Sequence, residues 1–298
     1  MKRHSCLSQR KPQSMNPPRA AKLNPFIVGD YFQKLNNVLE KYDLKRQPVK
    51  IFNMDEKGCR LTLHHQQTVI TQKEHAENCT IVTCANALGN AIPPMFLFKG
   101  QRIKPTFSDR LPPGSQVRMA PKVSMTTSLF IEWLHHFSNF IQLPVPLIFD
   151  GAASHLDISI VDAAEPLGIH LLCLPSNTTH ELQPLDKSVS LFRTYWDEEL
   201  LRYWDKYPDR KMNKERFSEV FTPVWSRWMT MANITHGFRT TGIYPFDKNV
   251  IPEHAYGPSV PTQQNHTQNE PEGNDEDSSD SDDRQLTKHV TPLKKNTF

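Results

Sequence analysis

The chain has 298 residues, 37% of them hydrophobic, with 24 prolines and a formal net charge of +3. This length suits one large domain with a sizeable core, and the many prolines indicate solvated extensions beside it. The sequence has no apolar run near 18 residues and no apolar stretch after its first charges, so it predicts neither a membrane span nor a signal peptide.

The N-terminal part divides into a basic arm and a helical lead-in. Residues 1–24 form the arm, and six Lys and Arg but no acid lie within residues 1–22. Residues 25–45 are expected to be helical, because Asn24 can cap a helix that begins with Pro25. Apolar residues recur there at helical spacing, namely Ile27, Tyr31, Leu35, Val38 and Tyr42.

A domain is expected over residues 46–255, and its first part reads as strands followed by alternating helices and strands. Strands are predicted at 49–54, 80–87, 92–98, 145–149 and 169–174, with helices at 128–141 and from about 158 to 167. A hairpin turn at 88–90 joins the second and third strands, and a loop fills 99–125. Early hairpins followed by βαβ alternation predict an α/β fold, a mixed sheet with helices on both faces.

Helices are predicted to complete the domain, and an acidic tail follows it. One helix at 187–206 carries an apolar stripe that is expected to be core, and another stretch at 213–232 is expected to restart at Thr222-Pro223. Residues 256–298 should be disordered, because they contain almost no large apolar residue. Residues 270–298 have eight acids and four bases, so the rest of the chain has a net charge of +7. A basic body is typical of proteins that meet nucleic acid, although a solvated linker explains the arm equally well.

Three aspartates stand in distinctive settings. Asp55 and Asp150 follow apolar runs with strand character, and Asp186 precedes an amphipathic helix. Carboxylates at about 4 Å repel one another by roughly 4 kcal/mol per pair at an effective dielectric of about 20. Such a cluster needs a cation, and hard oxygen ligands suit Mg²⁺ or Mn²⁺. Two ions held together perform in-line phosphodiester chemistry.

The sequence resembles the DDE catalytic region of pogo/Tigger-type transposases, a branch of the mariner superfamily that includes jerky-like and centromere protein B-like proteins. The matching segments, in order, are 52–58 (FNMDEKG), 91–100 (AIPPMFLFKG), 149–155 (FDGAASH), 172–186 (LCLPSNTTHELQPLD) and 237–246 (GFRTTGIYPF). The resemblance implies an RNase H-like fold in which Asp55, Asp150 and Asp186 are the catalytic residues and hold the metal. It also implies that two Mg²⁺ or Mn²⁺ ions are bound.

Several other polar residues lie near these acids in the sequence. Glu56 should point away from Asp55 along a strand, and Glu181 is not expected to be a ligand. Ala152 stands where the family often has a histidine, which bears on activity. Five residues can either support the site's loops or contact DNA, with support favoured for those before the third acid: His155, Thr178, Thr179, His180 and Gln183.

The leading interpretation is a nuclear, metal-dependent DDE endonuclease that cleaves and transfers DNA strands. DNA is its expected partner, with a possible homodimer on DNA, no membrane and no small-molecule substrate. The tandem helix-turn-helix modules usual in the family are not recognisable before residue 46. The alternative is a domesticated or degenerate DNA- or chromatin-binding protein that keeps the fold without catalysis. The five scattered cysteines fit reduced thiols.

Overall fold

A computed structural model describes residues 23–62, 78–152, 155, 157–207, 209, 212–253 and 255–256. All of them belong to one compact unit, Met1–Val260. The predicted basic arm, apart from its last two residues, lies outside the described residues, as does the predicted acidic tail beyond residue 256.

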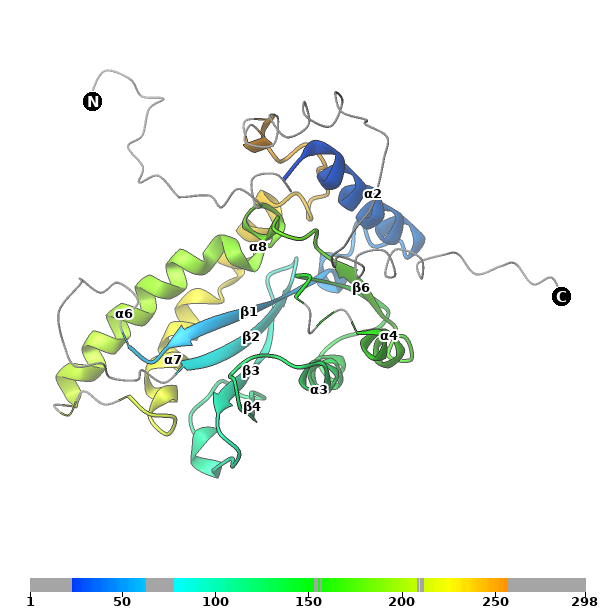
Figure 1. Cartoon of the computed structure of the whole chain (residues 1–298). Helices are drawn as coiled ribbons and strands as arrows, with labels where there is room; N and C mark the ends of the chain where they lie inside the picture. The colour runs from blue at the N-terminus through cyan, green and yellow to red at the C-terminus, as the bar shows by residue number, and fades with distance from the viewer. Residues whose placement is uncertain are drawn as a thin grey trace, which may run out of the picture. The chain divides into compact units, whose positions relative to one another are not determined.

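Six strands form one mixed sheet in the order β4-β3-β2-β1-β5-β6 (Figure 1). The strands are β1 (Phe52–Arg60), β2 (Asn78–Asn86), β3 (Ala91–Lys99), β4 (Gln116–Ala120), β5 (Val145–Phe149) and β6 (Ile169–Cys173). The first three pair antiparallel, whereas β5 runs parallel to β1 and to β6, and β4 runs parallel to β3. An antiparallel meander extended by parallel crossovers is the RNase H-like arrangement, so the predicted fold class is confirmed.

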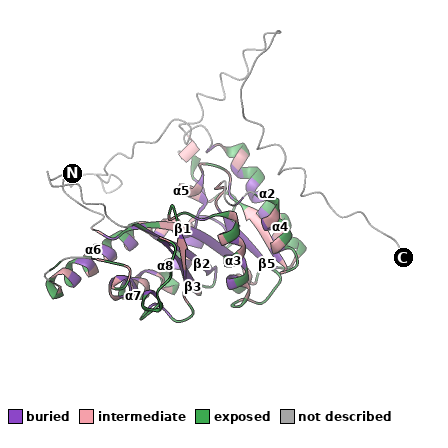
Figure 2. Ribbon diagram, turned by 60° about the horizontal axis from the view of Figure 1, so that its bottom comes forward, coloured by how far each residue is buried: buried purple, intermediate pink, exposed green. Residues whose placement is uncertain are grey.

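Helices cover both faces of this sheet. They are α2 (Pro25–Lys41), α3 (Thr127–Ser138), α4 (Ile158–Ala164), the short α5 (Thr179–Leu182), α6 (Val189–Lys206), α7 (Phe217–Trp228) and α8 (Met231–Thr240). Their sheet-facing sides are buried and their outer sides exposed, as Figure 2 shows. The predicted amphipathic stripe of α6 is accordingly core, since Phe192, Trp196 and Leu200 are fully buried.

The two faces hold different apolar clusters. On one face, Phe130 and Trp133 of α3 pack with Met54 of β1 and its neighbours. The opposite face carries two clusters, one built around α2 and α8 and the other around α6 and α7. Because successive strand residues point to opposite faces, Asp55 lies on the face with two clusters and Glu56 on the other.

The first strand differs from its prediction. It was expected at 49–54, with Asp55 after its end, but β1 begins at Phe52 and continues to Arg60. Pro48 instead starts a short 3-10 turn over Pro48–Lys50, and residues 55–60 then pair with 78–83 of β2. Asp55 therefore lies in the middle of a central strand, where its pairing with Thr83 of β2 restricts its backbone.

Two further expectations were wrong. The segment 99–125, predicted as loop, contains β4, which adds to the edge of β3. The helix expected to restart at Thr222-Pro223 instead runs through Pro223, while the new helix α8 begins after Thr230, whose side chain accepts a hydrogen bond from the backbone N–H of Asn233. Burial of Phe221 and Val224 on either side of Pro223 compensates for the backbone hydrogen bond that proline cannot make.

Candidate active site at the polar edge of the sheet

Three different elements supply the three acids. Asp55 comes from the middle of β1, and Asp150 directly follows β5, the parallel neighbour of β1. Asp186 lies in the 3-10 turn Leu185–Ser188, which leads into α6. The first two acids thus come from neighbouring strands, and the third comes from the turn that leads into the next helix, as the sequence predicted for Asp186.

A buried amide pair fixes the third-acid segment to the first strand. The Asn53 side chain donates to the carbonyl of Ile148 at 3.0 Å and to Gln183 Oε1 at 3.1 Å, and it accepts from the Leu185 backbone N–H at 3.2 Å. Gln183 Nε2 in turn donates to the Met54 carbonyl at 2.8 Å and to Asp55 Oδ1 at 3.3 Å. Both amides are fully buried, so these bonds are made in a low-dielectric interior and hold β1, β5 and the Asp186 segment in register.

Lys57 lies between the first and third acids. It is two residues after Asp55 on the same strand face, and its Nζ is 3.0 Å from Asp186 Oδ1 and 3.3 Å from Asp55 Oδ2. Only the Asp186 contact has hydrogen-bond geometry, so Asp55 Oδ2 is a buried carboxylate oxygen without a hydrogen bond. Burial disfavours the ammonium, but the charges of the two acids outweigh it and raise the pKa of Lys57.

The charge balance of this group leaves Asp55 poorly compensated. Burial raises the pKa of Asp55 to about 6, Lys57 opposes that rise, and the charges of Asp186 and Asp150 add to it. The dependence on both other acids shows that all three belong to one electrostatic site. One ammonium is not enough to keep Asp55 in its ordinary ionisation range.

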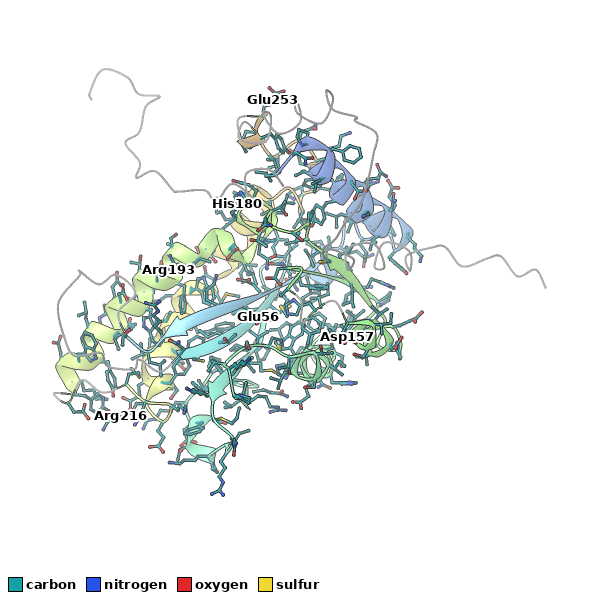
Figure 3. The ribbon with its side chains drawn as sticks, viewed as in Figure 1. Glu56, Asp157, His180, Arg193, Arg216 and Glu253 are labelled. Carbon is teal, nitrogen blue, oxygen red and sulfur yellow. The ribbon has the colours of Figure 1, made fainter. Side chains whose placement is uncertain are left out.

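The second acid has a different cation. His155 is enclosed by Phe130 and Phe149, with ring centroids 4.6 and 5.7 Å away, and its side chain is 1% exposed. Its Nδ1 lies 2.9 Å from Asp150 Oδ1, and its Nε2 lies 2.7 Å from Glu56 Oε1. Glu56, which is labelled in Figure 3, therefore lies on the opposite face of β1 from Asp55, as expected, and it anchors the residue that contacts Asp150.

The pKa values of this second group shift in the opposite sense. Burial alone would lower the pKa of His155, but its contacts with Asp150 and Glu56 outweigh burial and raise that pKa to about 10. Burial likewise works to raise the pKa of Asp150, and the hydrogen bond and charge of His155 reverse the effect and lower it. The charge of this imidazolium, whose Nδ1 also donates to the backbone carbonyl of Asp150 at 3.1 Å, thus keeps Asp150 ionised.

The remaining polar residues before Asp186 face the protein itself. Thr178 is fully buried and donates to the Pro175 carbonyl at 2.7 Å, while Thr179 and His180 are half-buried in α5. The His180 carbonyl accepts from Lys187 at 2.8 Å, and Lys187 also pairs with Glu181 at 2.9 Å. These contacts have the geometry of loop support.

The donor chemistry of the site fits a divalent metal ion. The charges of Asp150 and Asp186 both act on Asp55, which has a buried oxygen that lacks a hydrogen bond. Within the described residues, no three His, Cys, Asp or Glu side chains already stand in a metal-holding group. The reason is visible in the contacts: Lys57 lies between Asp55 and Asp186, and Asp150 turns one oxygen toward His155.

Sequence reasoning missed Asn53, Lys57 and the link from Glu56 to His155. Alternation along β1 could have placed Lys57 beside Asp55, since residues two apart share a face. The link between Asn53 and Gln183 spans 130 positions, and no local pattern reveals it.

Comparison with known proteins identifies the family. The family model described as DDE superfamily endonuclease matches residues 76–238, more than half of the chain. The chain belongs to the DDE superfamily endonuclease family. The match includes Asp150 and Asp186 of this DDE protein and begins after Asp55.

Other similarities are weaker. The DDE chain is 26% identical over 220 residues to the MFS-type transporter clz9 of Cochliobolus lunatus, which covers 67% of this chain but 24% of that protein's length. None of the helices in the described residues has the length and apolarity needed to cross a membrane.

Solved structures of the Mos1 transposase are also similar. One is the paired-end complex with the left transposon end, with a TM-score of 0.42, 13% identity and coverage of 80% of this chain and 67% of that one. Another is the Mos1 mariner catalytic domain, with a TM-score of 0.37, 13% identity and coverage of 76% and 98%.

Proposed function

We propose that this domain is the catalytic domain of a DDE transposase of the pogo/Tigger type, which cleaves and joins DNA strands with Mg²⁺ or Mn²⁺. Asp55, Asp150 and Asp186 are its metal ligands. The observation that carries the proposal is the meeting of these acids, from β1, the end of β5 and the turn before α6, at one poorly compensated site.

Divalent ions at such a site activate the attacking oxygen of a water or DNA 3′-hydroxyl and stabilise the leaving oxygen. The chain's own contribution is positioning. Asp55 is held within a central strand, and the pair Asn53 and Gln183 fixes the Asp186 segment against it. His155 keeps Asp150 ionised and fixes the orientation of its carboxylate.

DNA is the proposed substrate, and the nucleus is the proposed location. The support is the charge distribution, with +7 outside residues 270–298 and six basic residues at 1–22. Basic proteins bind phosphate backbones by displacing counterions, so this affinity should be largely independent of sequence and fall steeply with salt.

One observation favours a second candidate, a DNA-binding protein without catalysis. The cation position between Asp55 and Asp186 is filled by the protein's own Lys57. A domain whose acids are permanently neutralised in this way would keep its fold and its basic surface but would not cleave DNA.

A nicking assay separates the two. The full chain is incubated with supercoiled plasmid and Mn²⁺, beside Asp55→Ala, Asp150→Ala and Asp186→Ala. The matched control is Asp157→Ser, because Asp157 is an exposed helix-capping acid close to Asp150 and serine also caps helices. We expect nicking by the wild type and the control and loss in all three site variants.

Two results would go against catalysis. Nicking that survives Asp186→Ala at the wild-type rate would place the activity elsewhere or in a contaminant. Plasmid binding without any nicking at every Mn²⁺ concentration would favour the non-catalytic DNA-binding protein.

A further inference from the structure

Lys57 differs from the other lysines of the structure in its surroundings. Its side chain is 13% exposed, whereas a typical surface pair, Lys34 with Asp30, is 56% and 55% exposed. Lys57 contacts two acids from different elements, one in its own strand and one in the turn before α6. An ion pair held away from solvent is screened by salt far less than a surface pair, so the charge of this ammonium acts fully on the two acids.

We propose that Lys57 is the resident counter-ion of the acid site, and that a divalent metal ion binds there by displacing its ammonium from between Asp55 and Asp186. This inference rests on the proposed metal-dependent function. It adds a competition within the chain: the same two carboxylates serve Lys57 in the metal-free protein and the metal in the loaded one.

Geometry supports displacement over joint occupancy. The ammonium lies 3.0 and 3.3 Å from the two carboxylates, in the space that a bridging cation needs. Mg²⁺ binds carboxylate oxygens at about 2.0–2.1 Å, so an ion shared by the same oxygens would stand very close to Nζ. Two cations at that separation repel each other strongly.

The side chain is suited to leaving. Lysine has a flexible four-carbon stem and an ammonium that is not restricted to one bonding geometry, unlike arginine. Its contact with Asp55 already lacks hydrogen-bond geometry, so only the bond to Asp186 holds it in a fixed direction. Displacement therefore breaks one directed bond and returns the ammonium to solvent.

The contrast with Lys187 provides a control. Lys187 is adjacent to Asp186 in sequence and is also half-buried, but it pairs with Glu181 and the His180 carbonyl. Neutralising Lys187 removes one positive charge near the third acid without opening the position between Asp55 and Asp186.

The test is Mn²⁺ binding to the full chain by isothermal titration calorimetry, without DNA. Lys57→Met keeps the apolar stem and removes the charge, and we expect it to bind Mn²⁺ about tenfold more tightly than the wild type, a gain of about 1.4 kcal/mol. Lys187→Met should stay within about twofold of the wild type, and Asp55→Asn should lose most of the binding. Metal-free Lys57→Met should also melt at a lower temperature, with a larger upward shift on adding Mn²⁺.

A measurement on the unaltered protein covers the case in which Lys57→Met does not fold. Acetylation by an amine-reactive ester, followed by peptide mass spectrometry, reports the accessibility of each lysine. Added Mn²⁺ should increase the acetylation of Lys57 several-fold and leave that of Lys187 unchanged.

The outcomes separate this inference from the proposed function. Equal Mn²⁺ affinity in wild type and Lys57→Met, with loss in Asp55→Asn, overturns the displacement and leaves the metal site standing. Weaker binding by Lys57→Met, or protection of Lys57 by Mn²⁺, also overturns it, because Lys57 would then support the loaded site. Absence of Mn²⁺ binding in every protein overturns both.

Discussion

Two cations of the protein neutralise the acids of the site, and they do so with different geometry. On one face of β1, the flexible ammonium of Lys57 lies between Asp55 and Asp186. One oxygen of Asp55 is left without a hydrogen bond, and the pKa of Asp55 rises to about 6. On the other face, the rigid imidazolium of His155 contacts Asp150 and Glu56, and the pKa of Asp150 falls. The two carboxylates also differ in burial, since the Asp55 side chain is 9% exposed and that of Asp150 is 36% exposed, and burial is the largest cause of the raised pKa of Asp55.

The Lys57 group can exchange its cation, whereas the His155 group keeps its own. Lys57 can rotate away from its strand, whereas His155 is packed between two aromatic rings. Asp150 is thus held in a fixed orientation, whereas Asp55 and Asp186 are paired with a cation that a divalent metal ion can displace. Predictions that remove each cation or each acid test this division.

Removal of His155 should have the largest effect on stability. His155→Ala leaves Asp150 and Glu56 without their shared cation and opens a cavity beside Phe130 and Phe149. Breaking a buried pair costs about 3 kcal/mol at the low end of the range, which suits acids that are partly exposed. Urea unfolding with chelator present measures the loss. Glu56→Gln, which keeps an acceptor for Nε2, should cost less than half as much, and equal losses would contradict a role for the charge at Nδ1.

The ion pairs of His155 should also make the free energy of unfolding depend on pH. The folded pKa of His155 is about 10, above its ordinary 6.5, so its stabilisation is complete below pH 6.5 and is lost as pH rises through about 10. Between pH 6.5 and 9 the metal-free wild type should lose about 3 kcal/mol more unfolding free energy than His155→Gln. Parallel curves for the two proteins in this window would show that His155 is neutral in the fold.

The next largest effect is expected at the buried amide pair of Asn53 and Gln183. Gln183→Ala leaves the Asn53 amide and the Met54 carbonyl without a buried partner, at a cost of about 2 kcal/mol. Because Gln183 also bonds to Asp55, the variant should bind Mn²⁺ more weakly as well as unfold at lower urea. Thr179→Ala, a half-buried position in the same segment, should stay within about 0.5 kcal/mol on both counts.

The sequence was sufficient for the framework of this site. Apolar runs and turn residues predicted β5 at its observed bounds, the hairpin of β2 and β3, and the helix that follows Asp186. These elements depend on local periodicity, and they supply the strands and the helix around which the site is built. The resemblance of short motifs to those of the transposase family singled out the three acids, and their roles as metal ligands stay predictions.

What the sequence did not reveal depends on contacts between distant residues. Pairing with β2, rather than local apolarity, extends β1 past Asp55, and β4 forms because the edge of β3 is available. The partners of the acids have the same origin, since Glu56 meets His155 across 99 positions and Lys57 meets Asp186 across 129. Only the assembled sheet shows which cation each acid has.

The smallest expected effect is the sharpest test of the comparison, because the same substitution should have opposite signs at the two acids. Asp55 is ionised at a cost at pH 7.5, so Asp55→Asn should raise the unfolding free energy of the metal-free protein by about 1 kcal/mol. Asp150 is stabilised by His155, so Asp150→Asn should lower it by about 1 kcal/mol. Below pH 4 Asp55 is protonated in the folded state, so the gain from Asp55→Asn should vanish there. Urea unfolding with chelator at pH 7.5 measures both, and Asp157→Ser serves as the control for an exposed acid. If both site variants shift stability in the same direction, the two cations are equivalent and the division between an exchangeable and a fixed group is wrong.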